Sequence, residues 1–276
     1  MIRAGVVGWP VDHSLSPKLH GYWLEKYSID GEYLKIPVDP KDFEAGIRAL
    51  AGRGFSGFNV TVPHKEAAFR LMDEADAAAQ RLRAVNTVTV RPDGKLQGGN
   101  TDGFGFLENL KAGLGRPALP AGPAMVIGAG GAARAIVGAL LDEGIGDIRL
   151  ANRTAARAER LAADLGGPVS IVDWDMRDGN LADVALLINA TSLGMAKSPT
   201  LEFSLSGLAP DAVVTDIVYA PLETPLLAAA RARGHRTVDG LGMLLHQGRP
   251  GFERWFGVAP EVDGRLRSRM LEALGQ

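Results

Sequence analysis

Short apolar runs alternate with amphipathic stretches over the first hundred residues. The runs at 2–8, 32–38 and 57–62 have the length and composition of strands, whereas residues 17–27 and 43–50 place their apolar side chains at helical spacing. Strands that alternate with helices are typical of a mostly parallel sheet. The pattern therefore predicts an α/β domain in this part of the chain.

A hairpin and a linker follow. The sequence predicts a helix over 74–83, and then two strand-like runs at 86–90 and 95–99 on either side of the turn Arg-Pro-Asp-Gly. A further helix is expected over 104–114. The residues rich in Gly and Pro at 113–123 favour a connection between two domains.

The alternation restarts beyond this linker. Further strands and helices are expected at 124–127, 132–141, 147–153, 154–165, 185–191, 212–219 and 222–231. A parallel α/β unit of this kind is complete near Val238. We therefore expect the last segment, 240–276, to return to the first domain as two helical stretches separated by residues 250–260.

The composition narrows the possible functions. The 276 residues are 46% hydrophobic and carry a net charge of −2, so the chain is globular and lacks the basic surface that nucleic acid or an anionic membrane would require. There is no cysteine, so redox chemistry must come from a cofactor. The five histidines match no metal-binding spacing, and no metal is expected. Without a long apolar run or a leader-like segment, a cytoplasmic location is expected.

A glycine-rich turn opens the second domain. Directly after the apolar run at 124–127, the motif consists of Gly128, Gly130, Gly131, Ala132 and Ala133. Glycines let the backbone turn sharply and approach a pyrophosphate, whose charge then meets free N–H groups at the start of a helix. Because a strand precedes this turn and a helix follows it, the motif predicts a dinucleotide-binding site rather than a plain connection.

The end of the next strand indicates which dinucleotide binds. An Asp or Glu there would bond the ribose 2′-hydroxyl of NAD, but the chain has Asn152, Arg153 and Thr154, with Arg157 one helical turn later. Arginine forms charge-assisted, bidentate bonds with phosphate. The residues therefore favour NADP over the alternative that both arginines simply lie on a solvated helix face.

Polar motifs also follow the predicted strands of the first domain. They are His13-Ser14-Leu15-Ser16-Pro17, Asn59-Val60-Thr61-Val62-Pro63-His64-Lys65, Ala84-Val85-Asn86-Thr87 and Gly99-Asn100-Thr101-Asp102-Gly103. Open α/β sheets bind ligands outside the carboxyl ends of their strands, so these segments are expected to converge on one cleft that faces the nucleotide. Taken singly, Ser16 and Asp102 could instead be ordinary helix caps.

In this order the motifs resemble those of the shikimate dehydrogenase family. GWPVDHSLSPKLH, GFNVTVPHKE, AVNTV, GGNTDG, GAGGAAR, NRT, NATSLGM and DGLGMLLHQG extend from about Gly8 to Trp255. The resemblance implies reversible, NADP-dependent reduction of 3-dehydroshikimate to shikimate, a step of chorismate and aromatic amino acid biosynthesis. With the element pattern, it predicts a substrate-binding catalytic domain over 1–102 completed by 241–276, a connecting helix and linker over 103–117, and a Rossmann NADP-binding domain over 118–240.

The resemblance also assigns roles to residues of this chain. It implies that Lys65 and Asp102 flank the reacting oxygen. The implied substrate-binding residues are Ser14 and Ser16 at the carboxylate with Tyr219 nearby, Thr61, Asn86 and Gln247 at the ring hydroxyls, and Asn59. The implied cofactor-binding residues, besides the glycine-rich motif, are Asn152, Arg153, Thr154 and Arg157 at the adenosine phosphate, and Thr191, Ser192, Ile217, Gly240 and Met243 at the ribose and the nicotinamide.

The chemistry of these residues suits such roles. Hydroxyl and amide groups offer a hydrogen-bond partner to each hydroxyl of a polyol as it leaves water. Reduction of a ketone by hydride builds negative charge on its oxygen, which a cationic Lys65 would stabilise and could protonate. Which of Lys65 and Asp102 finally transfers the proton stays open, because coupled groups titrate as a pair.

Some alternatives stay open. The chain could be a quinate/shikimate dehydrogenase that uses NAD, or a protein that binds a dinucleotide and a polyol without turnover. The sequence is compatible with a monomer or a homodimer. Pro250 is expected to kink the helix after Gln247 and so to affect the position of Gln247. Residues 196–205 lack obvious anchors and are expected to form a mobile loop over the cofactor.

Overall fold

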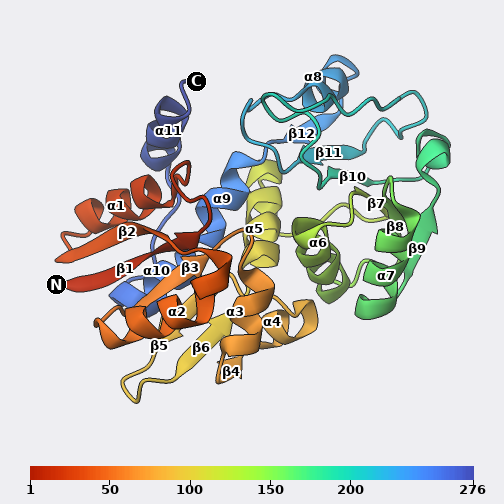
Figure 1. Ribbon diagram of the computed structural model, residues 1–276. Coiled ribbons are helices and arrows are strands. Elements are labelled where there is room, and N and C mark those ends of the chain that lie inside the picture. Colours follow the sequence, from red (N-terminus) through yellow and green to blue (C-terminus); the bar gives the residue numbers. More distant parts are fainter. The chain divides into compact units, whose positions relative to one another are not determined.

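Two six-stranded sheets, one in each of two units, organise residues 1–276 of the computed structural model (Figure 1). Unit 1 consists of Met1–Thr101 and Gln247–Gln276, and unit 2 of Asp102–His246. Most strand pairs in both sheets are parallel, which confirms the predicted α/β class. None of the helices combines the length and the apolar character needed to cross a membrane.

The sheet of unit 1 has the strand order β2-β1-β3-β5-β6-β4. Its strands are β1 (Ile2–Gly8), β2 (Gly31–Pro37), β3 (Gly57–Val60), β4 (Glu74–Ala75), β5 (Thr87–Val90) and β6 (Leu96–Gly99). β1 pairs in parallel with β2 and β3, whereas β5 runs antiparallel to β3 and β6, so the predicted hairpin is confirmed. The predicted helix over 74–83 is partly wrong, because its first two residues pair with β6 as β4.

Helices cover both faces of this sheet. They are α1 (Ser16–Lys26), α2 (Phe43–Gly52), α3 (Lys65–Leu71), α4 (Ala77–Leu82), α10 (Arg249–Phe256) and α11 (Gly264–Ala273), with a short 3-10 turn at Pro40–Asp42. Side chains of α2, α3 and α4 form one core with Phe58 and Val88 of the sheet. α1 and α10 bring a cluster of rings to the sheet, among them His20, Trp23 and Phe252, and His20 stacks on Tyr33 of β2.

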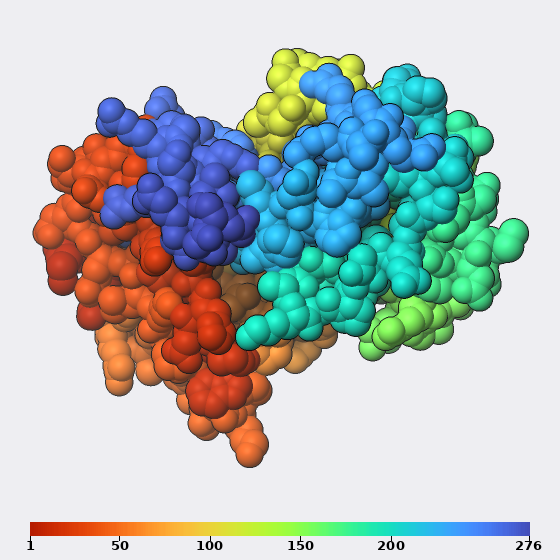
Figure 2. Space-filling view, turned by 90° about the horizontal axis from the view of Figure 1, so that it is seen from above, coloured from red at the N-terminus to blue at the C-terminus, as the bar shows by residue number.

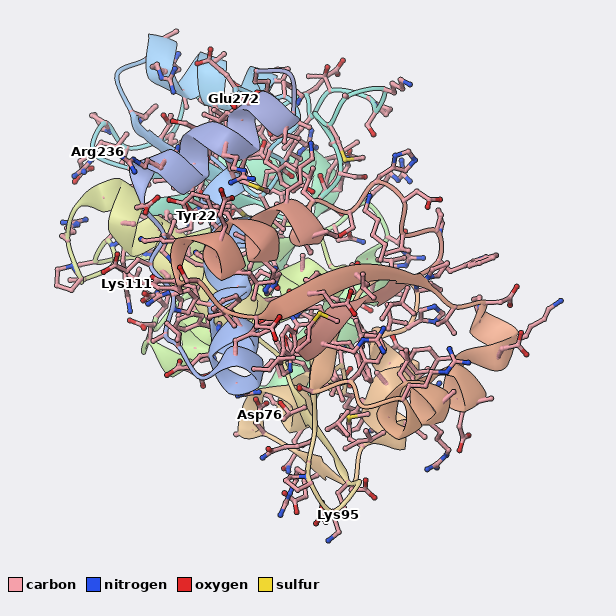
Figure 3. All side chains as sticks on the ribbon, turned by 90° about the vertical axis from the view of Figure 1, so that its left-hand side faces the viewer. Tyr22, Asp76, Lys95, Lys111, Arg236 and Glu272 are labelled. Atoms are coloured by element: carbon pink, nitrogen blue, oxygen red, sulfur yellow. The ribbon has the colours of Figure 1, made fainter.

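The last thirty residues complete unit 1. Trp255 of α10 donates its indole N–H to the carbonyl oxygen of Val88, 2.9 Å away. A Cβ at Gly57 would lie 2.1 Å from the same indole nitrogen, so only glycine lets α10 approach β3 this closely. α11 packs against α1, and Figure 2 shows these blue and red segments in contact. Tyr22 of α1 lies below α11 in Figure 3 and donates to Asp263, which caps α11.

The expected break at 250–260 is wrong in its first half, because Arg249–Phe256 form α10. Pro250 lies in the first turn of this helix, where an N–H would have no partner inside the helix. The preceding helix, α9 (Leu241–Gln247), ends at Gln247, and Gly248 is the N-cap of α10. Pro250 thus begins a new helix instead of kinking the one that carries Gln247.

Every strand pair in the sheet of unit 2 is parallel, in the order β12-β11-β10-β7-β8-β9. The strands are β7 (Ala124–Ile127), β8 (Ile148–Ala151), β9 (Val169–Val172), β10 (Leu186–Asn189), β11 (Val213–Asp216) and β12 (Arg236–Val238). Side chains of β7 alternate between two cores: Ala124 and Val126 face one, and Met125 and Ile127 face the other. Burial on both faces explains why the central strands are continuous apolar runs.

The helices of unit 2 flank its sheet. They are α5 (Asp102–Leu114), α6 (Gly131–Asp142), α7 (Ala155–Leu165), α8 (Pro225–Ala232) and the 3-10 helix η2 (Trp174–Gly179), followed by α9. α5, α6 and α7 share the first core, and α8 contributes to the second. α8 begins later than predicted, because the hydroxyl of Thr224 caps it by accepting from the N–H of Leu227.

The segment 196–205 is anchored at its C-terminal end. Leu201 and Leu205 are buried in the second core, and Arg177 donates to the carbonyl oxygen of Glu202 at 2.9 Å. The N–H of Ser204 donates to Asp178 at 3.0 Å. The expectation of a loop without anchors is therefore wrong for this half of the segment.

Candidate functional site

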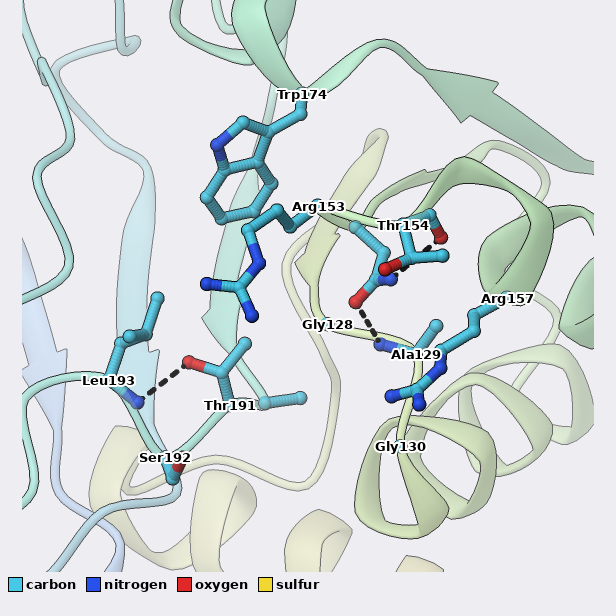
Figure 4. Close-up of a pocket in the computed structure, with 12 residues that line it drawn as sticks. Gly128, Ala129, Gly130, Arg153, Thr154, Arg157, Trp174, Thr191, Ser192 and Leu193 are labelled. Atoms are coloured by element: carbon cyan, nitrogen blue, oxygen red, sulfur yellow. Dashed lines mark hydrogen bonds between the residues drawn. The ribbon is translucent and has the colours of Figure 1, made fainter. Parts of the chain in front are cut away.

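A pocket of about 360 Å³ lies at the carboxyl edge of the unit 2 sheet (Figure 4). Its lining comes from the residues that follow β7, β8 and β10, together with Trp174 after β9. β7 pairs with β8 on one side and with β10 on the other. The chain therefore adds successive strands outward in one direction from β7 to β9, and in the opposite direction from β10 to β12. Open α/β sheets bind their ligands beside such a reversal.

The glycine-rich turn forms the floor of this pocket. Gly128 has φ +112°, and a Cβ there would lie 2.8 Å from Thr191 Cγ2 and 2.9 Å from the carbonyl oxygen of Ala190. A side chain would therefore both strain the backbone and separate the two loops. Gly130 is the N-cap of α6, so the unpaired N–H groups of the first turn of that helix lie beside the pocket. This arrangement suits a phosphate group.

Two arginines give the pocket its charge. Arg153 and Arg157 both line it, and both are exposed. Asn152 holds the loop in place, because its side-chain oxygen accepts from the N–H of Ala129 at 3.1 Å and its amide donates to the carbonyl oxygen of Thr154 at 2.8 Å (Figure 4). No Asp or Glu lines the pocket. The site is therefore suited to a group with more negative charge than a ribose hydroxyl.

A buried hydrogen-bond network holds the side of the pocket that follows β10. Asn189 accepts from the hydroxyl of Thr191 at 2.7 Å and donates to Asp216 at 3.0 Å. Asp216 also accepts from the N–H of Val218 and from the hydroxyl of Thr224. Burial raises the pKa of Asp216 above its usual value, while these donors oppose that shift. The network fixes the loops after β10 and β11 relative to each other.

The pocket gathers most, but not all, of the predicted cofactor residues. Those that line it are Gly128, Gly130, Asn152, Arg153, Thr154, Arg157, Thr191 and Ser192. Gly131, Ala132 and Ala133 belong to the first turn of α6 and are not among the lining residues. Ile217, Gly240 and Met243 lie elsewhere in unit 2, after β11 and β12.

Ile217 and Gly240 are brought together by backbone packing. A Cβ at Gly240 would lie 2.3 Å from the carbonyl oxygen of Ile217, so these two loops touch through main-chain atoms. The N–H of Ile217 donates to the carbonyl oxygen of Asn189 at 3.1 Å, which continues the contact toward Thr191. The predicted residues at the ends of β10, β11 and β12 thus form a row along one edge of the sheet.

Trp174 was not predicted as a pocket residue. This side chain lines the pocket, although no tryptophan was among the predicted site residues. The sequence could have indicated this residue, because an aromatic side chain two positions after the carboxyl end of a strand lies near the ligand-binding edge of the sheet. That position can be recognised only when β9 is known to be a strand. Ala129, Ala190 and Leu193 also line the pocket without having been predicted.

In unit 1, the predicted polar residues gather at the corresponding edge of the sheet. Asn86 precedes β5, and its side-chain oxygen accepts from the N–H of Thr101 at 2.9 Å. Asn59 donates to the carbonyl oxygen of Asn86 at 3.1 Å and accepts from the hydroxyl of Tyr33 at 2.7 Å. Thr101 donates its hydroxyl to the carbonyl oxygen of Gln247 at 2.8 Å. A chain of hydrogen bonds therefore links Asn59, Asn86 and Gln247.

Lys65 lies beside this chain of hydrogen bonds. It is the first residue of α3, and its carbonyl oxygen accepts from the N–H of Val85 at 2.9 Å. Thr61 follows β3, and its N–H donates to the carbonyl oxygen of Val7 at 2.9 Å. Main-chain bonds thus hold Lys65 next to Asn86 and Thr61 next to the end of β1.

The remaining predicted residues take different positions. Ser14 precedes α1, and its hydroxyl accepts from the N–H of Ser16 at 3.3 Å. Ser16 is buried as the first residue of α1, and Leu15, not Ser16, is the N-cap. Asp102 is the first residue of α5 and of unit 2, directly after Thr101. Tyr219 follows β11 in unit 2, where burial raises the pKa of its hydroxyl.

His20 is a fully buried histidine. Its ring stacks on Tyr33 with a centroid distance of 3.9 Å, and burial lowers its pKa to about 3 from 6.5. The folded state thus keeps His20 neutral at pH values where the unfolded chain binds a proton. The free energy of unfolding therefore falls as the pH drops below 6.5, and the loss continues toward pH 3.

We expect this histidine to cost about 1.7 kcal/mol of stability between pH 6.5 and pH 5, because the slope rises from half of 1.36 kcal/mol per pH unit at pH 6.5 toward the full value at lower pH. Denaturant unfolding followed by tryptophan fluorescence measures the loss, because Trp9, Trp23 and Trp255 report on unit 1. His20→Phe keeps a stacked ring and should lack this part of the pH dependence. An identical slope in the variant and the parent would contradict the assignment.

Three family models match the chain. One described as the shikimate dehydrogenase substrate binding domain matches residues 6–88, one described as shikimate / quinate 5-dehydrogenase matches 116–202, and one described as the shikimate 5′-dehydrogenase C-terminal domain matches 240–264. Curated relatives cover almost the whole chain. The chain is 58% identical over 268 residues to the shikimate dehydrogenase (NADP(+)) of Paramagnetospirillum magneticum, covering 97% of each. It is 56% identical over 274 residues to that of Rhodospirillum rubrum, covering 97% of this chain and 96% of the relative.

Solved structures are similar over the same length. The shikimate 5-dehydrogenase of Thermus thermophilus, in complex with NADP(H) and shikimate, is 37% identical with a TM-score of 0.85, and the match covers 100% of this chain and 99% of that one. The quinate dehydrogenase of Corynebacterium glutamicum, in complex with NAD, is 33% identical with a TM-score of 0.91, covering 98% and 99%. The glycine-rich pocket, the polar edge of unit 1 and these matches lead to one conclusion: the chain belongs to the shikimate dehydrogenase family.

Proposed function

We propose that this protein reduces 3-dehydroshikimate to shikimate with NADPH, reversibly, as a step of aromatic amino acid biosynthesis. The observation that carries the proposal is the row of amide and hydroxyl groups at the edge of the unit 1 sheet beside Lys65. A polyol ring needs such partners when it leaves water. The relatives named shikimate dehydrogenase (NADP(+)) support this substrate.

The cofactor follows from the pocket of unit 2. Arg153 and Arg157 are the groups that would hold a 2′-phosphate, and no acidic residue is present there to bond a free 2′-hydroxyl. Gly128 and Gly130 leave room for the pyrophosphate beside the start of α6. The pocket therefore fits NADP better than NAD, although a solved structure of similar fold is a quinate dehydrogenase with NAD.

On the substrate side, unit 1 acts as the substrate-binding domain. Ser14 and Ser16 bind the carboxylate, while Thr61, Asn86 and Gln247 bind the ring hydroxyls. Asn59 is buried, and its side chain bonds Tyr33, Thr87 and the backbone of Asn86. It therefore supports the position of Asn86 from within the protein.

A dinucleotide held by Gly128, Gly130, Arg153 and Arg157 would supply the hydride that reduces the C3 carbonyl. Negative charge then develops on the carbonyl oxygen, and the ammonium group of Lys65 stabilises it at that atom. A proton passes from the Lys65 and Asp102 pair to this oxygen, so the product leaves as an alcohol. In the reverse direction the same pair accepts the proton of the hydroxyl.

A panel of substrate and cofactor pairs tests this function. Purified protein is assayed with shikimate or quinate and with NADP or NAD, and nicotinamide absorbance is followed. We expect the highest kcat/KM for shikimate with NADP. A preference for quinate with NAD would assign the chain to quinate oxidation, and no absorbance change with any cyclic polyol would leave only a binding role.

A further inference from the structure

Trp174 is the aromatic side chain of the cofactor pocket. It begins η2 two residues after β9, and β9 pairs in parallel with β8. Its indole therefore stands at the same edge of the sheet as Arg153, and Figure 4 shows both side chains in the pocket, with the guanidinium of Arg153 extending away from the indole in the direction of Thr191. The ring is only half-buried, although it packs partly against the second core of unit 2.

Other side chains hold this indole in place before any ligand binds. The guanidinium of Arg177 lies over the Trp174 ring at 4.2 Å, and the ring of Phe203 follows at 5.6 Å from the same guanidinium. Arg177 is fixed in turn, since it donates to the carbonyl oxygens of Trp174 and Glu202. A ring preorganised in this way loses little entropy on binding.

The positions of the phosphate sites decide what lies next to Trp174. The pyrophosphate belongs at the turn of Gly128 and Gly130, and the 2′-phosphate belongs beside Arg153 and Arg157. The ribose would then lie at the end of β8, and the adenine attached to it would extend one strand further outward. That next strand is β9, with Trp174 after its end.

We propose that Trp174 stacks on the adenine of the dinucleotide and forms one wall of the adenine site. The proposal rests on the proposed function for its ligand. The indole ring would stack on the flat face of the adenine. Because NADP and NAD contain the same adenine, this contact should contribute equally to the affinity for both. Arg153 and Arg157, in contrast, distinguish the two through the phosphate.

Binding measurements on the intact protein test this proposal. The dissociation constants of NADP, NAD and adenosine 2′,5′-bisphosphate are measured by calorimetry for the parent, Trp174→Ala and Trp174→Phe. We expect the alanine variant to bind all three roughly tenfold more weakly, as for the loss of one base stack. The phenylalanine variant should stay within about threefold, because it keeps an aromatic face. Met176→Ala is the matched control, since Met176 is an exposed apolar residue of η2 that does not line the pocket.

Fluorescence provides a second readout that does not need the alanine variant to fold. Trp174 is the tryptophan of unit 2, whereas the other three belong to unit 1. Adenosine 2′,5′-bisphosphate should therefore quench the emission of the parent, and this quenching should be lost in Trp174→Phe. The proposal would be overturned if Trp174→Ala bound the nucleotides with parental affinity, or if it lost affinity for NADP alone. It would also be overturned if the ligand did not change the emission of the parent.

These experiments contain no shikimate. Failure to turn over shikimate would contradict the proposed function and leave the adenine contact standing. A protein that turns over shikimate with NADP, but binds nucleotides independently of Trp174, would contradict the adenine contact alone.

Discussion

Replacement of Lys65 by alanine should lower kcat with NADPH and 3-dehydroshikimate by about 1000-fold, within the range of a lost general acid that also stabilises an oxyanion. The change removes the ammonium group and leaves the main chain intact, so the bond from Val85 to the carbonyl oxygen of residue 65 remains. NADP affinity should change less than twofold, because the cofactor pocket is built from unit 2. Steady-state kinetics and calorimetry measure the two effects.

Two comparisons sharpen this prediction. Lys65→Met keeps the length of the side chain without its charge and should be as inactive as the alanine variant. Lys95→Ala removes an exposed lysine of the same unit, in the β5–β6 hairpin turn labelled in Figure 3, and should retain the parent rate. Parental activity in Lys65→Ala would remove this residue from the mechanism.

The double variant Arg153→Ala and Arg157→Ala should lose its preference for NADP. Each guanidinium contributes charge-assisted bonds to a phosphate, and we expect kcat/KM with NADP to fall by roughly 100-fold when both are absent. The value with NAD should stay within about threefold of the parent, because NAD carries no 2′-phosphate. Kinetics with both cofactors at one ionic strength measure the switch.

Arg160→Ala is the matched control for this variant. Arg160 is an exposed arginine on α7, the helix that carries Arg157, and it does not line the pocket. Its removal tests whether general positive charge on α7 is sufficient to attract NADP. Equal losses with NADP and NAD in the double variant would mean that the arginines hold the pyrophosphate or the base instead of the 2′-phosphate.

The sequence predicted the central elements of both units well, for a physical reason. β7, β10 and β11 are buried on both faces, so they stand out as continuous apolar runs. Two strands at the edges of the unit 2 sheet, β9 and β12, were not predicted. Both are short and partly exposed, and their residues therefore lack a clear apolar pattern.

Local rules failed where distant contacts decide the structure. Glu74 and Ala75 have good helix propensity, but they pair with β6 as a short edge strand. Pro250 was read as a kink, yet it occupies a first helical turn because a new helix starts after Gly248. The loop of Leu201 and Leu205 was read as unanchored because the core that buries these side chains comes from other parts of unit 2.

Some residues of the candidate site could be predicted from the sequence, and others could not. Gly128, Asn152 and Arg153 were predictable because phosphate chemistry requires those residue types directly after strands. Trp174 was not, since nothing in its neighbouring sequence distinguishes an aromatic residue of a pocket from one in a core. The supporting role of Asn59 also becomes visible only with its hydrogen bonds to Tyr33 and Asn86.

The bond from Trp255 to Val88 affects the order in which the chain can fold during synthesis. Unit 2 is a continuous segment, so a ribosome has released all of it before the last thirty residues emerge. The aromatic face of the first sheet, in contrast, must wait for α10 to cover it. Nascent unit 1 therefore exposes apolar surface throughout the translation of unit 2, and this period is when the protein is most exposed to aggregation.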